Sequence, residues 1–111
     1  MPLTNRGKYI TLQAIMQNAT SVSLLSPDGD VIVSLQFDDE TVVKQFTDNK
    51  LYINIDIATT DNRISGLLPF TIGGIAIKDN TDQLATDQFA SPKQVSSSNS
   101  AISISWVIEV N

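Results

Sequence analysis

The last stretch of the chain, Ala101 to Val110, constrains the fold more than any other part of the sequence. Its apolar residues take every second position: Ile102, Ile104, Trp106, Ile108 and Val110. Because side chains on a β-strand point alternately to opposite faces, this pattern predicts a strand with one buried face. The only Trp of the protein lies in the middle of that face, where a large ring fills the centre of a small core. We therefore expect the rest of the chain to be organised around this strand.

Shorter alternating runs earlier in the chain predict further strands. They cover Ser21–Ser26, Val31–Phe37, Thr41–Phe46, Leu51–Ala58 and Phe70–Lys78. The run Ser-Pro-Asp-Gly-Asp at 26–30 predicts a tight turn, since Pro27 presets one backbone angle and Gly29 adopts the left-handed conformation easily. A second turn is predicted at 47–50. The pair Gly73-Gly74, inside its strand, indicates a bulge or a close approach of another backbone.

The polar segments between these strands predict connections. Turns are expected at Thr59–Arg63 and Asp79–Asp82, irregular structure at Ile64–Pro69, either a short strand or a helical turn at Gln83–Ala90, and a surface loop at Ser91–Ser100.

The N-terminal segment has a helical period instead. Tyr9, Leu12, Ile15 and Met16 recur at spacings of three and four, and Ile10 and Ala14 widen this stripe. The pattern predicts a helix that is capped by Thr4 or Asn5 and runs to about Ala19. A helix of this kind needs a surface to lie on, and the sheet is the candidate within the chain.

These elements predict a mainly β protein: an antiparallel β-sandwich or jelly roll with one N-terminal α-helix. The length of 111 residues fits a single domain, with the helix in residues 1–19 and the strands in residues 20–111. No apolar run approaches the length that spans a membrane, so membrane insertion is not expected.

The charge distribution argues against nucleic-acid binding. The formal net charge is −5, and Arg6 and Lys8 precede all twelve acidic residues. Residues 21–111 carry five basic residues against those twelve, a net charge of −7. Such a surface repels phosphate backbones.

Enzymatic activity is not expected either. The chain contains no His and no Cys, so the usual general bases and nucleophiles are reduced to carboxylates, Lys, Tyr and Ser. No paired-carboxylate signature is present, and the Ser residues cluster in predicted loops. We expect no catalytic residues and no cofactor.

A calcium site is the one metal alternative that the acidic residues raise. Asp28 and Asp30, with Asp38, Asp39 and Glu40 one strand away, supply the oxygen ligands that Ca²⁺ takes. The first two are also ordinary turn residues, and the triplet is an ordinary solvated strand end. Because the spacing matches no known calcium loop, we expect no metal site.

Three segments carry a resemblance to a known group of proteins. The opening string L-T-N-R-G-K-Y at 3–9 resembles the start of small virion structural proteins of tailed bacteriophages, labelled tail fibre or minor structural proteins. The segment Gly73–Asp79 is similar to a glycine-then-apolar strand of that group. The segment from Ser91 to the end is similar to its proline-containing loop and alternating final strand. The resemblance touches both ends and about half of the chain.

This resemblance implies a structural component of a phage virion, in the tail tip, baseplate or fibre. Its partners would be other virion proteins and further copies of itself, and its location the virion, assembled in the cytoplasm of the bacterial host. A capsid cement protein is the alternative within the same class. A carbohydrate-binding or receptor-binding module is the alternative from another class, and its sugar site would need exposed aromatic rings. With Trp106 predicted to be buried, only Tyr9 and Tyr52 remain for that role.

Arg6, Lys8 and Tyr9 form the candidate subunit contact. One interpretation is a helix start in which Tyr9 is buried and both cations are solvated. The functional interpretation is an assembly contact, in which this basic helix end meets the acidic face of a neighbouring subunit. In a symmetric particle, one such contact is repeated around a ring.

Overall fold

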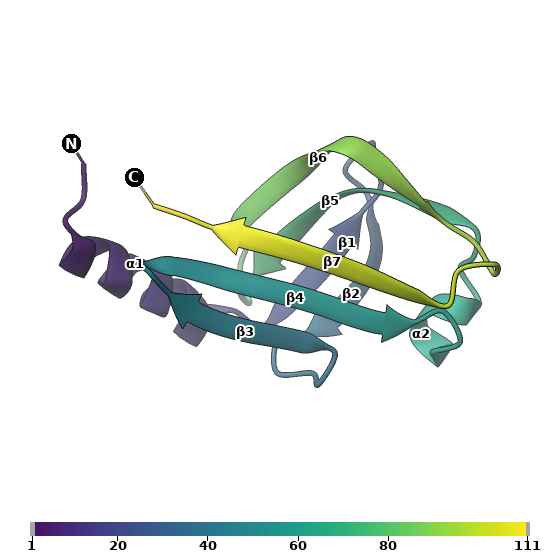
Figure 1. Ribbon diagram of the computed structural model, residues 1–111, viewed down its shortest axis with the longest axis horizontal. Coiled ribbons are helices and arrows are strands. Elements are labelled where there is room, and N and C mark those ends of the chain that lie inside the picture. The colour runs from purple at the N-terminus through teal and green to yellow at the C-terminus, as the bar shows by residue number, and fades with distance from the viewer. Residues whose placement is uncertain (1, 111) are drawn as a thin grey trace.

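The computed structural model (Figure 1) describes residues 2–110 and contains two helices and seven strands in that range. In chain order they are α1 (Asn5–Asn18), β1 (Ser21–Leu25), β2 (Val31–Gln36), β3 (Val42–Thr47), β4 (Lys50–Ala58), α2 (Asn62–Ser65), β5 (Phe70–Lys78), β6 (Gln83–Val95) and β7 (Ala101–Ile108).

The strands form two antiparallel sheets that pack face to face. One sheet has the order β2-β1-β5-β6 and the other has the order β3-β4-β7. In Figure 1 the three-stranded sheet lies in front, and α1 lies at one end of the molecule. The predicted sandwich with one N-terminal helix is confirmed.

The core lies between the inner faces of the two sheets. Each strand of the three-stranded sheet contributes alternate residues to it, as the sequence pattern predicts. Strand β4 contributes four fully buried residues, Leu51, Ile53, Ile55 and Ile57. Strand β7 contributes four buried residues, Ile102, Ile104, Trp106 and Ile108. Trp106 is 7% exposed and lies opposite Ile53, so its predicted place in the core is confirmed.

Helix α1 begins where the sequence predicts. Thr4 is its cap, and the Thr4 hydroxyl accepts a hydrogen bond from the Gly7 N–H at 3.2 Å. Leu12 is fully buried, while Ile15 and Met16 are half-buried against the core. The helix therefore closes one end of the sandwich with only part of its apolar stripe.

Both predicted hairpin turns are present. Gly29 has φ +90°, and the Ser26 N–H donates to the Asp30 carbonyl at 2.8 Å. At the second turn, Asp48 and Asn49 both have positive φ, at 54° and 59°. Two such residues form the mirror-image turn whose twist suits a tight hairpin.

The loop predicted for Ser91–Ser100 is wrong over its first half. Strand β6 continues to Val95, because residues 93–95 pair with residues 70–72 of β5. Between the two paired segments, residues 89–92 of β6 have no partner on β5 and the register shifts. Of the two alternatives for Gln83–Ala90, the strand is confirmed, and so is the bulge predicted at Gly73-Gly74.

The irregular segment predicted for Ile64–Pro69 also needs a correction. Its start belongs to α2, a single helical turn that begins at Asn62 within the predicted turn Thr59–Arg63. Asp61 caps this turn, and Ile64 is fully buried beneath it. One buried apolar residue in four is too little for a recognisable helical period.

Candidate functional site

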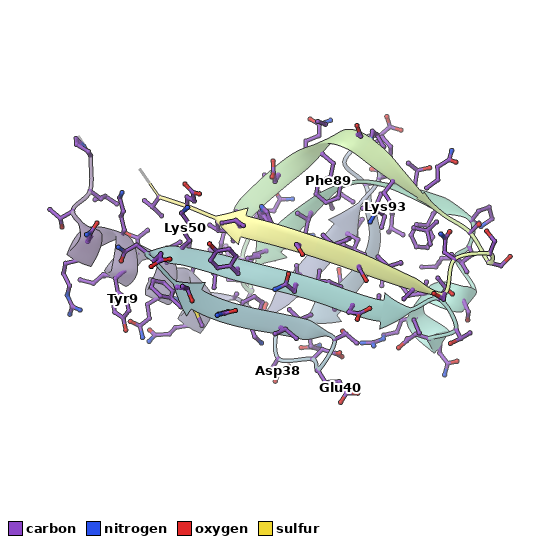
Figure 2. All side chains as sticks on the ribbon, in the orientation of Figure 1. Tyr9, Asp38, Glu40, Lys50, Phe89 and Lys93 are labelled. Atoms are coloured by element: carbon purple, nitrogen blue, oxygen red, sulfur yellow. The ribbon has the colours of Figure 1, made fainter. Side chains whose placement is uncertain are left out.

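The candidate contact residues lie in the first two turns of α1, at the end of the molecule. Figure 2 shows Tyr9 there, beside the end of the three-stranded sheet. Arg6 is exposed and Lys8 is half-buried. We call this end of the molecule, defined by Arg6, Lys8, Tyr9 and Ile10, the helix pole.

Tyr9 connects α1 to the sheet. Its ring meets the Phe46 ring of β3 edge to face, with 5.1 Å between the ring centroids and 79° between the planes. The guanidinium carbon of Arg6 lies 5.5 Å from the centroid of the same Tyr9 ring. An aromatic pair and a cation over its face are both attractive arrangements, so Tyr9 holds Arg6 in place.

The interpretation with Tyr9 buried is therefore wrong: 36% of this residue is exposed. The structure brings Arg6 and Tyr9 together, and Lys8 shares no such contact with them. Within residues 2–110, neither Arg6 nor Lys8 lies within 4.0 Å of a carboxylate oxygen. The ion pairs in that range join Lys50 to Glu109 and Arg63 to both Asp39 and Asp61. Both cations of the pole therefore keep their charge available to a partner.

An apolar groove runs along α1 from Ile10, a residue of the helix pole, to Asn18. It has a volume of about 550 Å³ and is lined by Ile10, Thr11, Ala14, Ile15, Asn18, Asp79 and Leu84. Ile10 is 53% exposed. The helical period points to Ile10 and Ala14, but no sequence signal points to Asp79 and Leu84, which the fold brings from the β5–β6 connection and from the start of β6. Among the described residues, the pole thus combines positive charge that makes no ion pair with exposed apolar surface.

The acidic residues do not assemble into a metal site. In the described part of the chain, no three acidic side chains lie where they would hold one ion together. Asp39 binds Arg63 instead, at 2.7 Å, and Arg63 also binds Asp61, the cap of α2. This Arg63 clamp ties the β2–β3 turn to α2, while Asp38 and Glu40 stay exposed on either side of Asp39 (Figure 2).

Hydrogen bonds from Thr41, and to a lesser extent from Arg63, change the acidity of Asp39. Hydrogen bonds from the backbone N–H and the hydroxyl of Thr41, and then from the guanidinium of Arg63, lower the pKa of Asp39 from 3.8 to about 2. Each of these donors stabilises the ionised carboxylate. The same guanidinium lowers the pKa of Asp61.

We expect the hydrogen bonds that Asp39 accepts from Thr41 and Arg63 to make stability depend on acid pH. A carboxylate whose pKa is lowered by folding stabilises the fold above its unfolded pKa of about 3.9, and this contribution is lost as the pH falls toward 2. Asp39→Asn keeps an acceptor for Thr41 but loses the charge. Its thermal midpoint should lie below that of the parent at pH 7, and the gap should narrow as the pH falls from 4 to 2.

The matched control for this measurement is Asp38→Asn. Asp38 is the exposed neighbour and makes no ion pair within residues 2–110. The control should match the parent at pH 7. An Asp39→Asn midpoint that also matches the parent at pH 7 would contradict a stabilising role for the clamp.

Tyr52 is the second ring that a sugar site would use. It lies on the outer face of β4, paired with Gln45 on one side and Val107 on the other, and it is half-buried. Asn54 and Asp56 follow on the same face, but their carboxamide and carboxylate oxygens accept hydrogen bonds from Ser105 and Ser103. The face thus offers one partly covered ring and polar groups that already have partners.

Comparisons with known proteins leave the family open. No protein-family model matches the chain. No curated protein and no solved structure matches it either. Over residues 2–110, the helices are too short and too polar to cross a bilayer.

Proposed function

We propose that this protein is a structural component of a tailed-bacteriophage virion that acts through contacts between subunits. The tail tip, baseplate or fibre is the favoured place, and a capsid cement role is the alternative. One observation carries the proposal: within residues 2–110, the helix pole holds two cations that make no ion pair, next to an exposed apolar groove along α1, on a chain that is otherwise acidic.

Three of the four residues that define the helix pole belong to the string that resembles the phage proteins. Arg6, Lys8 and Tyr9 all belong to L-T-N-R-G-K-Y. Opposite charges across an interface speed encounter and fix the orientation of the partners. The apolar groove adds surface whose burial favours association. A carbohydrate-binding role has less support, since Trp106 is buried and Tyr52 is half-buried. The ring of Tyr9, which is exposed, already contacts Phe46 and Arg6.

The test reverses both charges of the pole. Arg6→Glu with Lys8→Glu should leave the isolated protein folded, because changes at the surface usually alter stability by about 0.5 kcal/mol or less. The same variant should be depleted from assembled particles at least about tenfold, since like charges then face the acidic neighbour. Particle occupancy is measured by quantitative mass spectrometry of purified virions.

The matched control exchanges the two cations, Arg6→Lys with Lys8→Arg. This variant keeps both charges and the net charge of the chain. It should enter particles far better than the reversed variant. Normal occupancy of the reversed variant, with its fold intact, would contradict the assembly role of the pole.

A further inference from the structure

Strand β7 exposes one side of its backbone. It is an outer strand of the order β3-β4-β7, and among residues 2–110 it pairs only with β4. The Thr59 N–H donates to the Ser100 carbonyl at 3.1 Å. Because backbone groups alternate sides along an antiparallel strand, even-numbered residues of β7 bond to β4 and odd-numbered residues face away. We call the outward N–H and C=O groups of Ser103, Ser105 and Val107 the β7 edge.

The other outer strands carry features that hinder pairing. On β3, Lys44 lies in the inward-facing row, and its ammonium donates to the Phe37 carbonyl and lies 4.7 Å from the centre of the Phe37 ring. On β6, the unpaired segment 89–92 contains Pro92 and breaks the register. On β2, the pairing with β1 is irregular at Leu25. Inward charges, prolines and bulges are the devices that keep sheet edges from associating.

β7 has almost none of this protection. It pairs with β4 over eight successive residues without a register shift, and it contains no Pro and no charged residue. One group contacts its edge: the Lys93 ammonium, which donates to the Ser103 carbonyl at 3.1 Å. Figure 2 shows Lys93 and Phe89 of β6 above β7. Ser105 and Val107 have no such contact in the described residues.

We propose that the β7 edge pairs with the β7 edge of a second copy of this chain, in antiparallel orientation about a two-fold axis at Ser105. Sheet β3-β4-β7 then continues across the axis as one six-stranded sheet. This inference rests on the proposed role as a subunit present in many copies, and it names one of the contacts. It makes an isologous interface, in which the same strand serves both copies.

The sequence of β7 is complementary to itself in this register. Ser105 lies opposite Ser105 of the second copy, and Ser103 lies opposite Val107. The outward groups of these residues then form about six hydrogen bonds across the axis. On the inner face, Trp106 of one copy lies opposite Ile104 of the other, and pairs of aromatic and β-branched residues stabilise sheets.

The charges near the ends of β7 agree with this register. Glu109 of one copy lies opposite Ala101 of the other and not opposite a second Glu109. Within its own copy, Glu109 already pairs with Lys50 at 3.3 Å. Lys93 is the group that pairing displaces, since the Ser103 carbonyl accepts from Val107 of the second copy in its place.

A cysteine scan tests the contact directly, because the chain contains no Cys. Residues opposite each other in a hydrogen-bonded pair have Cα atoms about 5.5 Å apart, within the disulfide range of about 4.4–6.8 Å. Under mild oxidation, purified Ser105→Cys should form a disulfide-linked dimer at least about tenfold faster than Ser103→Cys. The double variant Ser103→Cys with Val107→Cys should cross-link as well. Non-reducing gels and light scattering give the readout.

Three further variants change the affinity of the dimer without introducing a cross-link. Ser105→Pro removes an N–H that β4 does not use and should abolish the dimer, while circular dichroism reports its fold. Ser105→Lys places like charges opposite each other across the axis and should also weaken the dimer. It replaces the Pro variant as the test if that variant does not fold. Lys93→Met removes the displaced group and should lower the dimer dissociation constant about fivefold or more.

Equal cross-linking of Ser105→Cys and Ser103→Cys, or none in either, would overturn the proposal. A purified parent protein that stays monomeric at high concentration, together with an unchanged Lys93→Met variant, would do so too. These measurements use the isolated chain, whereas particle occupancy of the charge-reversed helix pole tests the virion role. A negative result for dimerisation can therefore be distinguished from a negative result for the virion role.

Discussion

Trp106→Ala is expected to unfold the protein or to leave it barely stable. Trp106 is 7% exposed and lies on the inner face of β7 opposite Ile53, which is fully buried. Replacing a buried aromatic residue by Ala costs about 3–5 kcal/mol, because transfer energy is lost and a cavity remains. Small domains are stable by only about 5–15 kcal/mol, so this is a large share. The melting midpoint should fall by on the order of 15 °C.

The neighbouring residue provides the control for this experiment. Val107 is on the same strand but on the outer face, and it is 42% exposed. Val107→Ala should therefore shift the midpoint by no more than about 3 °C. Thermal unfolding followed by circular dichroism separates the two variants. If Trp106→Ala melts within a few degrees of the parent, the two faces of β7 are assigned the wrong way round.

Strands that alternate strictly could be predicted from the sequence, because one face of each is buried. In β4, Leu51, Ile53, Ile55 and Ile57 face the core and the residues between them face out. The turn at 26–30 could be predicted as well, since its geometry depends on the local residues Pro27 and Gly29. The capped start of α1 is equally local, with Thr4 accepting from Gly7.

The second half of β6 could not be predicted, because its side chains are mostly exposed. Within residues 91–95 only Val95 is buried, so no alternating pattern appears. This segment is a strand because of its backbone hydrogen bonds to β5. These bonds cannot be inferred from the hydrophobicity of the side chains. Helix α2 could not be predicted for a similar reason: only Ile64 of its four residues is buried, so no helical period appears.

The sequence predicts the residues of the helix pole but not all of their contacts, because some contacts join segments that are distant in the sequence. Arg6 and Tyr9 are three residues apart on one helix, so their contact is local. The contact of Tyr9 with Phe46 depends on where α1 meets β3, and the groove also needs Leu84 from β6. A period in the sequence tells which residues share a face, but not which distant element that face meets.

Gly73→Ala is expected to be the most damaging of the Gly-to-Ala changes outside turns. A Cβ atom at Gly73 would lie 2.4 Å from the Cα and 2.6 Å from the N of Pro27. Both are backbone atoms of the β1–β2 turn, so no side chain can rotate out of the way. Overpacking usually costs about 1–3 kcal/mol, and a clash with backbone belongs at or above the upper end of that range.

Gly66→Ala is the matched control for this clash. Gly66 has φ −78° in the right-handed helical region, and no heavy atom lies within 4 Å of an added Cβ. Ala at such a site restricts the unfolded chain and stabilises the fold by about 0.4–1 kcal/mol. Urea unfolding should therefore move the two midpoints in opposite directions. Equal midpoints for Gly73→Ala and the parent would mean that the β1–β2 turn moves away from β5 at little cost, and that the bulge at Gly73-Gly74 does not depend on this close approach.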